Sequence, residues 1–310
     1  MISLVGYTGF VGNNIYTSSE GSIEGLYNSQ NICKAYDTCP DLLIYAGIRA
    51  EKYLANNNPE KDYEMILGAE KNIKRINPKK LILISTVDVF KEPIDVNELS
   101  IVDTDRLHPY GYNRYKLEEW VREYYPDALI VRLPSLFGNG IKKNFIYDYI
   151  SVVPYMLNQK KYLELCEKDV QIEKYYKLQD NGFYRVDDNE KNSTKLKRIL
   201  QSVGFTAEKF TDSRCQFQFY NLSRLWSDIN IALDNGVKLL HLATEPILIS
   251  DLYFRLSGKS FDNLIEDKPL KYDYKSIYCD IFNGKDGYLY DAETIFSEIE
   301  EFVSSRKTIK

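Results

Sequence analysis

The sequence predicts an α/β protein built on a doubly wound parallel sheet, and three features support this. Short apolar runs alternate with amphipathic segments along the N-terminal half, and the first run leads directly into a glycine-rich turn. The runs hold four or five residues and are bounded by Gly, Pro or Lys, as is typical of strands covered on both faces. The expected strands are Ile2–Val5, Leu42–Tyr45, residues 81–84 and Leu129–Leu133.

Helical periodicity fills the segments between these strands. Pro59 opens one helix, whose apolar stripe ends before Pro78. A second helix is expected over about residues 112–125, where apolar residues recur at intervals of three and four. A third, over about residues 291–303, closes the chain. Alternation of strands and helices predicts right-handed crossovers between parallel strands.

The pattern weakens after about residue 140. Residues 155–215 are charged, rich in Tyr and only partly periodic. Regular apolar character returns over residues 237–243, which we expect to form a late strand of the sheet. The sequence therefore predicts that the chain leaves the sheet and later returns to it.

Composition excludes several classes of protein. Of the 310 residues, 40 are Lys or Arg and 45 are Asp or Glu, so this mildly acidic chain lacks the basic surface of a nucleic-acid binder. There are only two His residues, His108 in a loop and His241 in an apolar run, so we expect no metal site. No apolar run approaches the roughly 18 residues of a membrane span, and no signal peptide is expected.

The five cysteines are odd in number, widely spaced and without a CxxC pair. Such usage predicts reduced thiols and a cytoplasmic location, not a disulfide framework.

The glycine-rich turn GYTGFVG (residues 6–12) lies between the first expected strand and a helix. Glycines there permit a tight turn and close approach of a pyrophosphate to the helix N-terminus. The spacing is GxxGxxG instead of GxGxxG, and a glycine turn without a ligand stays an alternative. The candidate cofactor-binding residues are Gly6, Thr8, Gly9, Phe10, Val11 and Gly12.

The end of the second strand selects between nicotinamide cofactors. An acidic residue there binds the ribose 2′-hydroxyl of NAD. This chain has Asn28 and Ser29 at that point and no acid, which favours NADP over NAD, although NAD stays possible in the absence of a nearby Arg. We therefore expect a Rossmann-type dinucleotide-binding domain over residues 1–150. Residues 151–310 would form a smaller C-terminal substrate lobe, with about residues 216–250 returning to the sheet.

Tyr112 and Lys116 form the YxxxK pattern of the chain. Residues four apart share a helix face, so the Lys116 ammonium can favour the ionised form of the Tyr112 phenol. Tyr112 would then exchange a proton with a carbonyl or alcohol oxygen near neutral pH. The alternative is an ordinary aromatic residue on an amphipathic helix.

Ser85 and Thr86 follow the apolar run LILI at the expected carboxyl end of a strand. Ligands of open α/β sheets bind at that edge, so a hydroxyl there is well placed. A simple cap between strand and loop is the alternative.

These features together resemble the extended short-chain dehydrogenase/reductases that act on nucleotide-activated sugars. The resemblance rests on GYTGFVG, DLLIYAG, ISTVDVF, PYGYNRYK and VRLPSLFG, and it covers about residues 1–140. It continues more faintly at QFYNLSRLWSDINIAL and LLHLATEP. The ST-x-x-VF run is most similar to nucleotide-sugar 4-ketoreductases of the dTDP-4-dehydrorhamnose reductase type.

The resemblance implies a catalytic set of Thr86, Tyr112 and Lys116. It also implies that Lys116 holds the cofactor ribose and that Ala46 and Gly47 line the nicotinamide side.

Two substrate contacts are candidates as well. Asp88 is either an acid/base, a ligand of a sugar hydroxyl or a solvated residue at the mouth of the loop. The family's 4,6-dehydratases carry adjacent acids after the Thr, and Val87 here argues against dehydration. Asn144 stands near the position where the family often binds the sugar nucleotide.

The sequence thus predicts an NAD(P)-dependent reductase of a nucleotide-activated keto-sugar, acting in the synthesis of surface-polysaccharide or glycan precursors. Its partner would be a nucleotide-sugar substrate, with no nucleic acid or membrane, and a homodimer is considered. One alternative is an NAD-dependent nucleotide-sugar epimerase on the same fold. The other is a non-catalytic dinucleotide-binding regulator or scaffold.

Overall fold

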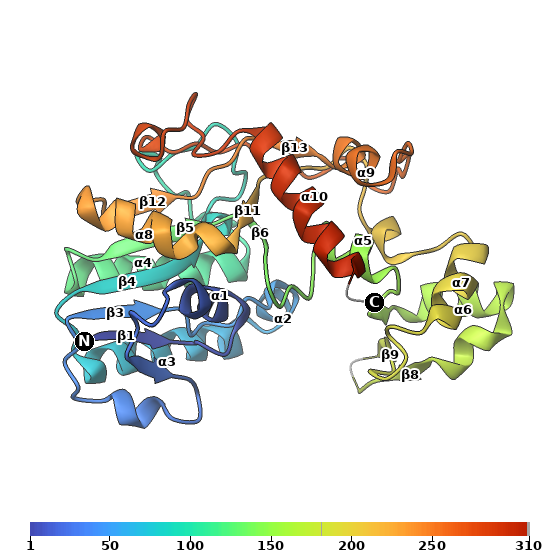
Figure 1. The fold of residues 1–310 in the computed structure, drawn as a ribbon. Coiled ribbons are helices and arrows are strands. Elements are labelled where there is room, and N and C mark those ends of the chain that lie inside the picture. Colours follow the sequence, from blue (N-terminus) through green and yellow to red (C-terminus); the bar gives the residue numbers. More distant parts are fainter. Residues whose placement is uncertain (181, 309–310) are drawn as a thin grey trace. The chain divides into compact units, whose positions relative to one another are not determined.

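The computed structural model describes residues 1–180 and 182–308. Its contacts divide the chain into two compact units (Figure 1). The first comprises Met1–Ile141, Gln216–Ile247 and Lys271–Glu298; the second comprises Lys142–Cys215, Leu248–Leu270 and the residues from Ile299 onward. That the second unit is a substrate lobe stays a prediction.

A sheet of six strands forms the centre of the first unit. The strands lie in the order β2-β1-β3-β4-β5-β12, and each neighbouring pair is parallel. The predicted α/β fold with a doubly wound parallel sheet is confirmed. The strands are β1 (Ile2–Val5), β2 (Gly25–Tyr27), β3 (Leu42–Tyr45), β4 (Leu81–Thr86), β5 (Leu129–Leu133) and β12 (Leu239–His241).

The apolar runs located the strands well, and two boundaries differ. The strand expected over residues 81–84 extends to Thr86, because Ser85 and Thr86 pair with Arg132 and Leu133 of β5. The strand expected over residues 237–243 covers only Leu239–His241. Val237 instead follows the preceding helix, where its amide donates a hydrogen bond to the Ala232 carbonyl oxygen. It is apolar because its side chain is buried in the core.

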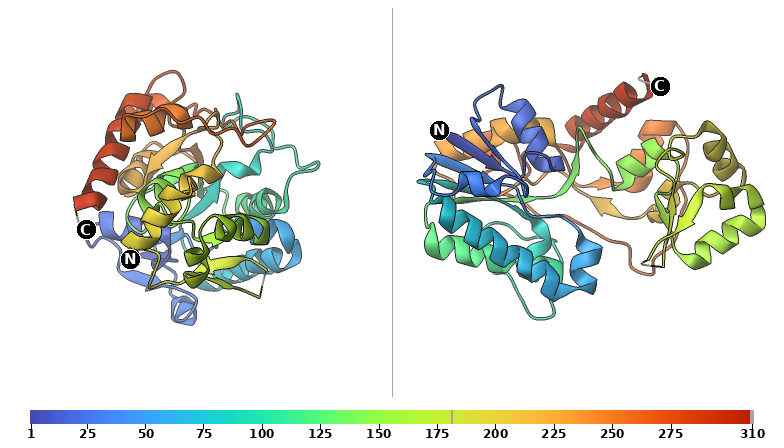
Figure 2. Two further views of the ribbon diagram at one scale, coloured as in Figure 1. Left: turned by 90° about the vertical axis from the view of Figure 1, so that its right-hand side faces the viewer. Right: turned by 90° about the horizontal axis from the view of Figure 1, so that it is seen from below.

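Helices cover both faces of this sheet (Figures 1 and 2). One face packs against α1 (Phe10–Ser18) and α8 (Leu225–Asp234), and the other against α3 (Pro59–Ile76) and α4 (Pro109–Tyr124). The helix predicted from Pro59 to a point before Pro78 is confirmed. The next helix begins at Pro109, three residues before the expected start near Tyr112.

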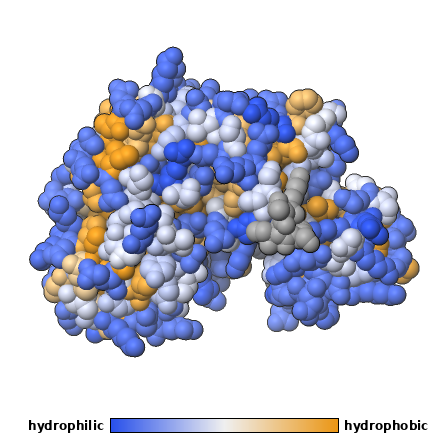
Figure 3. Space-filling model, viewed as in Figure 1, coloured by the Kyte–Doolittle hydropathy of each residue, from blue (hydrophilic) through white to orange (hydrophobic). Residues whose placement is uncertain are grey.

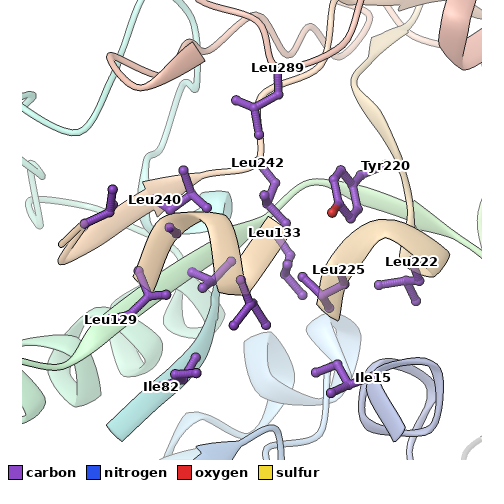
Figure 4. Packing of buried hydrophobic residues seen from close by; sticks show 14 of the residues in the cluster. Ile15, Ile82, Leu129, Leu133, Tyr220, Leu222, Leu225, Leu240, Leu242 and Leu289 are labelled. Carbon is purple, nitrogen blue, oxygen red and sulfur yellow. The ribbon is translucent and has the colours of Figure 1, made fainter. Parts of the chain in front are cut away.

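The core on the α1–α8 side is the larger of these two. Figure 4 shows Ile15 of α1, Ile82 of β4 and Leu225 of α8 within it. Each side chain is fully buried, and burial of such a residue stabilises a fold by roughly 1.5–3 kcal/mol. This packing holds the carboxyl ends of the strands in fixed positions.

Shorter elements complete the first unit. The strands β6 and β11 pair in parallel, and β10 pairs with β13. Their bounds, with those of the remaining short helices, are β6 (Ser135–Phe137), β10 (Gln216–Phe217), β11 (Phe219–Asn221), β13 (Ile247–Leu248), α2 (Lys52–Asn57), η1 (Ile32–Ala35), η2 (Val87–Val89), η5 (Leu222–Arg224) and η6 (Cys279–Phe282).

The second unit has a core of its own around a three-stranded antiparallel sheet in the order β7-β9-β8. The part of it that contains α6, α7, β8 and β9 in Figure 1 is mostly hydrophilic on the face that Figure 3 displays. Its elements, and the last helix, are α5 (Phe145–Ser151), β7 (Met156–Leu157), α6 (Gln159–Lys168), η3 (Val170–Lys174), β8 (Tyr176–Leu178), β9 (Tyr184–Val186), α7 (Thr194–Ser202), η4 (Ala207–Phe210), α9 (Ile249–Ser257) and α10 (Ala292–Thr308).

Candidate active site

The strand order places a topological switch point between β1 and β3. β2 lies on one side of β1 and β3 on the other, so the connections leave in opposite directions there. Ligands of open α/β sheets bind at such a switch point, at the carboxyl ends of the strands. Gly6 follows β1 with φ +93°, and a Cβ on it would lie 2.4 Å from the carbonyl oxygen of Ala46, which follows β3. The glycine turn and the Ala46–Gly47 turn therefore meet at this point.

The glycine turn has the shape that an anion requires. A Cβ on Gly12 would lie 2.2 Å from the Gly6 oxygen, so Gly12 is needed for packing inside the turn. Gly9, by contrast, is exposed, and a Cβ on it would meet only the Gly6 oxygen, at 3.3 Å. Gly9 begins α1 without a side-chain cap, and the first turn carries no acidic residue. The backbone amides there, flanked by Thr8 and Phe10, fit a pyrophosphate group.

Thr86 stands at the carboxyl end of β4, the strand next to β3. Neighbouring side chains of a strand point to opposite faces, and this separates the two hydroxyls. Ser85 donates to the buried Glu118 carboxylate at 2.5 Å. Thr86 accepts from the Asp88 amide at 3.1 Å, and its hydroxyl lies close enough to the Tyr110 phenol to lower the pKa of Tyr110 slightly. Of the predicted hydroxyl pair, Ser85 is therefore committed to the buried Glu118, whereas the Thr86 hydroxyl lies at the site.

The first turn of α4 brings Tyr110 to Thr86. His108 caps the helix by accepting from the Gly111 amide at 3.0 Å through Nδ1, and Asn56 of α2 accepts from the Tyr110 amide at 3.0 Å. A Cβ on Gly111 would lie 2.0 Å from the Asp88 carbonyl oxygen. Only glycine permits this approach, so the helix begins directly against η2.

Burial controls the protonation of Tyr110, whose side chain is 7% exposed. It raises the pKa of Tyr110 to about 12, with a smaller rise from the nearby Asp88 charge. The Arg114 charge and the hydrogen bond with Thr86 lower that pKa in part. Tyr110 is therefore a protonated donor throughout the physiological range.

Tyr112 and Lys116 lie on the outer face of α4. Tyr112 is 38% exposed, and the Lys116 ammonium lies 5.4 Å from the centre of its ring. The same ammonium binds the Glu119 carboxylate at 2.8 Å, and this hydrogen bond is the main cause of the raised pKa of Lys116. Thr86 influences the pKa of Tyr110, and among the described residues no hydrogen bond joins Thr86 to Tyr112. The structure thus brings Tyr112 and Lys116 together but not to Thr86, and their catalytic role stays a prediction.

Comparison with known proteins gives the fold. No family model and no curated protein matches this chain. Among solved structures, RMD from Pseudomonas aeruginosa in complex with NADPH is 13% identical with a TM-score of 0.65, each chain covered over 99%. The dTDP-4-dehydrorhamnose reductase from Yersinia enterocolitica is 15% identical with a TM-score of 0.63, covering 98% of this chain and 99% of that one. A UDP-glucuronic acid 4-epimerase from Bacillus cereus is 13% identical with a TM-score of 0.60, over 100% and 99%.

This chain shares the fold of these solved structures. The fold expected from the sequence motifs is thereby confirmed.

Arg114 lies four residues after Tyr110 on α4, so the two side chains share a face of the helix. Its guanidinium stacks 4.0 Å from the centre of the Tyr110 ring and forms a buried ion pair with Asp62. It also donates to the Arg49 carbonyl oxygen at 2.7 Å. The sequence analysis missed Tyr110 because it required Lys at the fourth position, and allowing Arg would have found it.

Asp88 lies close to Tyr110 and Arg114. One of its oxygens, Oδ1, accepts from the Lys52 ammonium at 3.0 Å and from the Tyr272 hydroxyl at 2.9 Å. The side chain remains 19% exposed. These two hydrogen bonds do not match the alternative that Asp88 is a freely solvated residue at the mouth of the loop.

A buried polar cluster anchors α4 to the central sheet. Glu118 accepts from Arg132 of β5 at 3.0 and 2.6 Å and from Arg122 at 2.8 Å. Arg132 also contacts Nε2 of His241, whose Nδ1 lies 3.1 Å from the Lys275 oxygen. Burial and the Arg132 charge lower the pKa of His241 to about 3. His241 is a satisfied core residue, as its apolar setting predicts.

Two predicted ligand contacts have local structural partners. Asn28 Oδ1 accepts from the Gln30 amide at 2.9 Å, so this side chain shapes the turn after β2. Asn144 belongs to the second unit, where Oδ1 caps α5 on the amides of Ile146 and Tyr147 at 3.1 and 3.3 Å. Their roles toward cofactor and substrate stay predictions.

Within residues 1–180 and 182–308, no helix is both long and apolar enough to cross a bilayer. No group of three or more His, Cys, Asp or Glu side chains in them could hold a metal ion.

Proposed function

We propose that this chain is an NAD(P)-dependent oxidoreductase that reduces the ketone of a nucleotide-activated sugar. The observation that carries the proposal is the proximity of the Thr86 hydroxyl and the Tyr110 phenol at the carboxyl end of β4. Two hydroxyls that converge at the ligand edge of the sheet can both hydrogen-bond one carbonyl oxygen.

The nicotinamide dinucleotide, when bound, supplies hydride to the substrate. The glycine turn fits its pyrophosphate, since Gly9 is exposed and begins α1 without a side-chain cap on the helix amides. Several solved structures of this fold contain NADPH, NADP or NAD. The residues proposed to hold the cofactor are Gly6, Thr8, Gly9, Phe10, Val11, Gly12, Asn28, Ala46, Gly47 and, from the sequence motif, Lys116.

This chain's residues would control the proton and the oxygen. Tyr110 would donate its proton to the oxygen that gains charge during reduction, because burial keeps the phenol protonated. Thr86 would hold the same oxygen by a second hydrogen bond. The sequence-based assignment of these tasks to Tyr112 and Lys116 is the competing proposal, and the two differ in the variant they predict to be inactive.

Cofactor preference is testable by titration. The turn at Asn28 has no acidic residue, and an uncharged end of β2 accommodates a 2′-phosphate. We expect NADPH to bind at least as tightly as NADH in a titration followed by tryptophan and tyrosine fluorescence. A preference for NADH of tenfold or more, about 1.4 kcal/mol, would contradict this expectation.

The function itself is tested by NADPH absorbance with a panel of keto nucleotide sugars carrying dTDP, UDP or GDP. We expect stoichiometric oxidation of NADPH with at least one member. Absence of turnover across the panel, in a folded protein that binds the cofactor, would contradict the reductase.

Two alternatives have specific support. Epimerases share this fold, and an epimerase would retain NAD through purification because it regenerates its cofactor. A non-catalytic regulator is supported by Arg114, whose guanidinium is occupied by Asp62 and the Arg49 carbonyl. Binding of a dinucleotide without turnover of any keto-sugar or epimer would favour the regulator.

The biological setting is part of the proposal. All five cysteines are free thiols, which supports a reducing, cytoplasmic compartment. A role in precursors of surface polysaccharides or glycans follows from the substrate class. Sedimentation analysis would decide whether the chain forms the considered homodimer.

A further inference from the structure

We propose that Asp88, oriented by Lys52 and Tyr272, binds a hydroxyl on the carbon next to the reacting carbonyl, so that the enzyme selects α-hydroxy keto-sugars. The inference rests on the proposed function and names a determinant of its substrate. It makes Asp88 a specificity residue, and it makes Lys52 and Tyr272 its positioning residues.

The first step is the position of Asp88. Its amide donates to the Thr86 hydroxyl at 3.1 Å, and its carbonyl oxygen lies against Gly111 in the first turn of α4. Asp88 is therefore fixed between the two elements that carry Thr86 and Tyr110. A substrate carbonyl held by these hydroxyls presents its neighbouring carbons to the Asp88 side chain.

The second step is the orientation of the carboxylate. Lys52 and Tyr272 both donate to Oδ1, at 3.0 and 2.9 Å. Across residues 1–180 and 182–308, no side chain or amide donates to Oδ2 of Asp88. Since the side chain is 19% exposed, this second oxygen keeps its hydrogen-bonding capacity and is accessible from the surface.

The third step is what the ion pair accomplishes. Lys52 is on α2 and Tyr272 is 184 residues after Asp88, so two segments distant from Asp88 in the chain converge on one of its carboxylate oxygens. The Lys52 side chain is 43% exposed, and pairs this exposed add little to the stability of a fold. Their effect is to hold one rotamer of Asp88, with Oδ1 occupied and Oδ2 presented.

The fourth step is the chemistry of the ligand. A carboxylate oxygen accepts hydrogen bonds and repels phosphate, so the group it binds must be a donor. In a keto-sugar, hydroxyls are the donors next to the carbonyl. A site built to bind a hydroxyl discriminates strongly against the analogue that lacks it, because the polar group is then left unpaired.

The experiment compares two substrates in wild type and variant. The substrates are a 4-keto-6-deoxy nucleotide sugar with hydroxyl at carbon 3 and its 3-deoxy counterpart, each with the nucleotide that supports turnover. We expect wild type to favour the hydroxylated substrate at least tenfold in kcat/KM. In Asp88→Asn the amide oxygen can keep the bonds to Lys52 and Tyr272, while its NH₂ cannot accept, and we expect the ratio to fall to about one.

Two further variants test the positioning. Lys52→Met and Tyr272→Phe should each lower the ratio about threefold, mainly through a higher KM for the hydroxylated substrate. Lys61→Met is the matched control, since Lys61 is exposed on α3 and should leave the ratio unchanged. Calorimetric binding of the two alcohol products gives a readout without turnover, and circular dichroism checks that each variant folds.

The outcomes separate the inference from the function on which it rests. A wild-type ratio near one, or an unchanged ratio in folded Asp88→Asn, overturns the inference while the reductase stands. If wild type reduces no keto nucleotide sugar at all, the proposed function fails and the inference fails with it.

Discussion

The two faces of α4 carry the same spacing of residues in opposite surroundings. On the inner face, Tyr110 precedes Arg114 by four residues, and both are buried. On the outer face, Tyr112 precedes Lys116 by four residues, and both reach solvent. Spacing shows which residues share a helix face, whereas contact with the sheet decides which face can do chemistry.

The sequence contained the information on which face of α4 is buried. Leu117 and Val121 are apolar and buried, and steps of three and four backward from them lead to Arg114 and Tyr110. Tyr112 lies off this stripe. A basic residue inside an apolar stripe is an unusual signal, and it marks a side chain with buried partners.

The largest effect should come from exchanging the tyrosines. Tyr110→Phe removes the proton donor that contacts Thr86, and we expect turnover to fall by about 10²–10⁴. Tyr112→Phe is the matched control on the outer face, where we expect less than a twofold change. Steady-state rates with a keto nucleotide sugar provide the measurement. If Tyr112→Phe lowered turnover more than Tyr110→Phe, the catalytic tyrosine would be Tyr112, as the YxxxK motif predicts.

The next effect tests how the inner face reaches the sheet. Gly111→Ala puts a Cβ 2.0 Å from the Asp88 oxygen and should destabilise the fold by roughly 1–3 kcal/mol, with loss of turnover. Gly68→Ala in α3 is the control, because nothing lies within 4 Å of its added Cβ. Alanine there should be neutral or stabilising by up to about 1 kcal/mol. Urea unfolding measures both, and equal stability of the two variants would contradict this packing.

A third test uses pH on the cluster that anchors the inner face. The pKa of His241 is about 3 in the folded chain and near 6.5 when unfolded, so its contribution to stability is complete above pH 6.5. That contribution is lost as pH falls toward 3, with a slope approaching about 1.4 kcal/mol per pH unit. His241→Gln should show a shallower fall in unfolding free energy over this window. Parallel curves for variant and wild type would argue that His241 titrates normally.

The smallest effect is expected on the outer face. Lys116→Met removes an exposed ion pair with Glu119, of the kind worth about 0.3–0.5 kcal/mol within a helix. We expect turnover and dinucleotide affinity to stay within about twofold, as measured by steady-state rates and fluorescence titration. Loss of both would instead support the sequence-based role of Lys116 at the cofactor ribose.

Prediction succeeded where local sequence decides the structure. β1, β3 and β5 coincide with apolar runs, because strands buried on both faces need continuous apolar residues. The glycine turn was recognised because steric contact at Gly6 and Gly12 leaves no alternative residue. These features fix the fold and the edge of the sheet at which ligands bind.

Prediction failed where distant segments meet. Lys52 and Tyr272 reach Asp88 from segments with no shared pattern, and Glu118 and Arg132 are charged residues that only their mutual contact makes tolerable in a core. Residues 155–215 also build a small core of their own without clear periodicity.

The bond from Arg114 to the Arg49 carbonyl has a mechanical consequence. It ties the turn after β3 to the helix that carries Tyr110, and a buried ion pair with Asp62 secures the other end of the guanidinium. Separating the Arg49 turn from α4 would remove one hydrogen bond from the buried Arg114 guanidinium, so this bond favours joint movement of the two segments. Among the described residues, no side-chain hydrogen bond is made to the exposed residues Thr8 and Gly9 of the glycine turn between β1 and α1, so we expect this turn to be the more mobile side of the switch point.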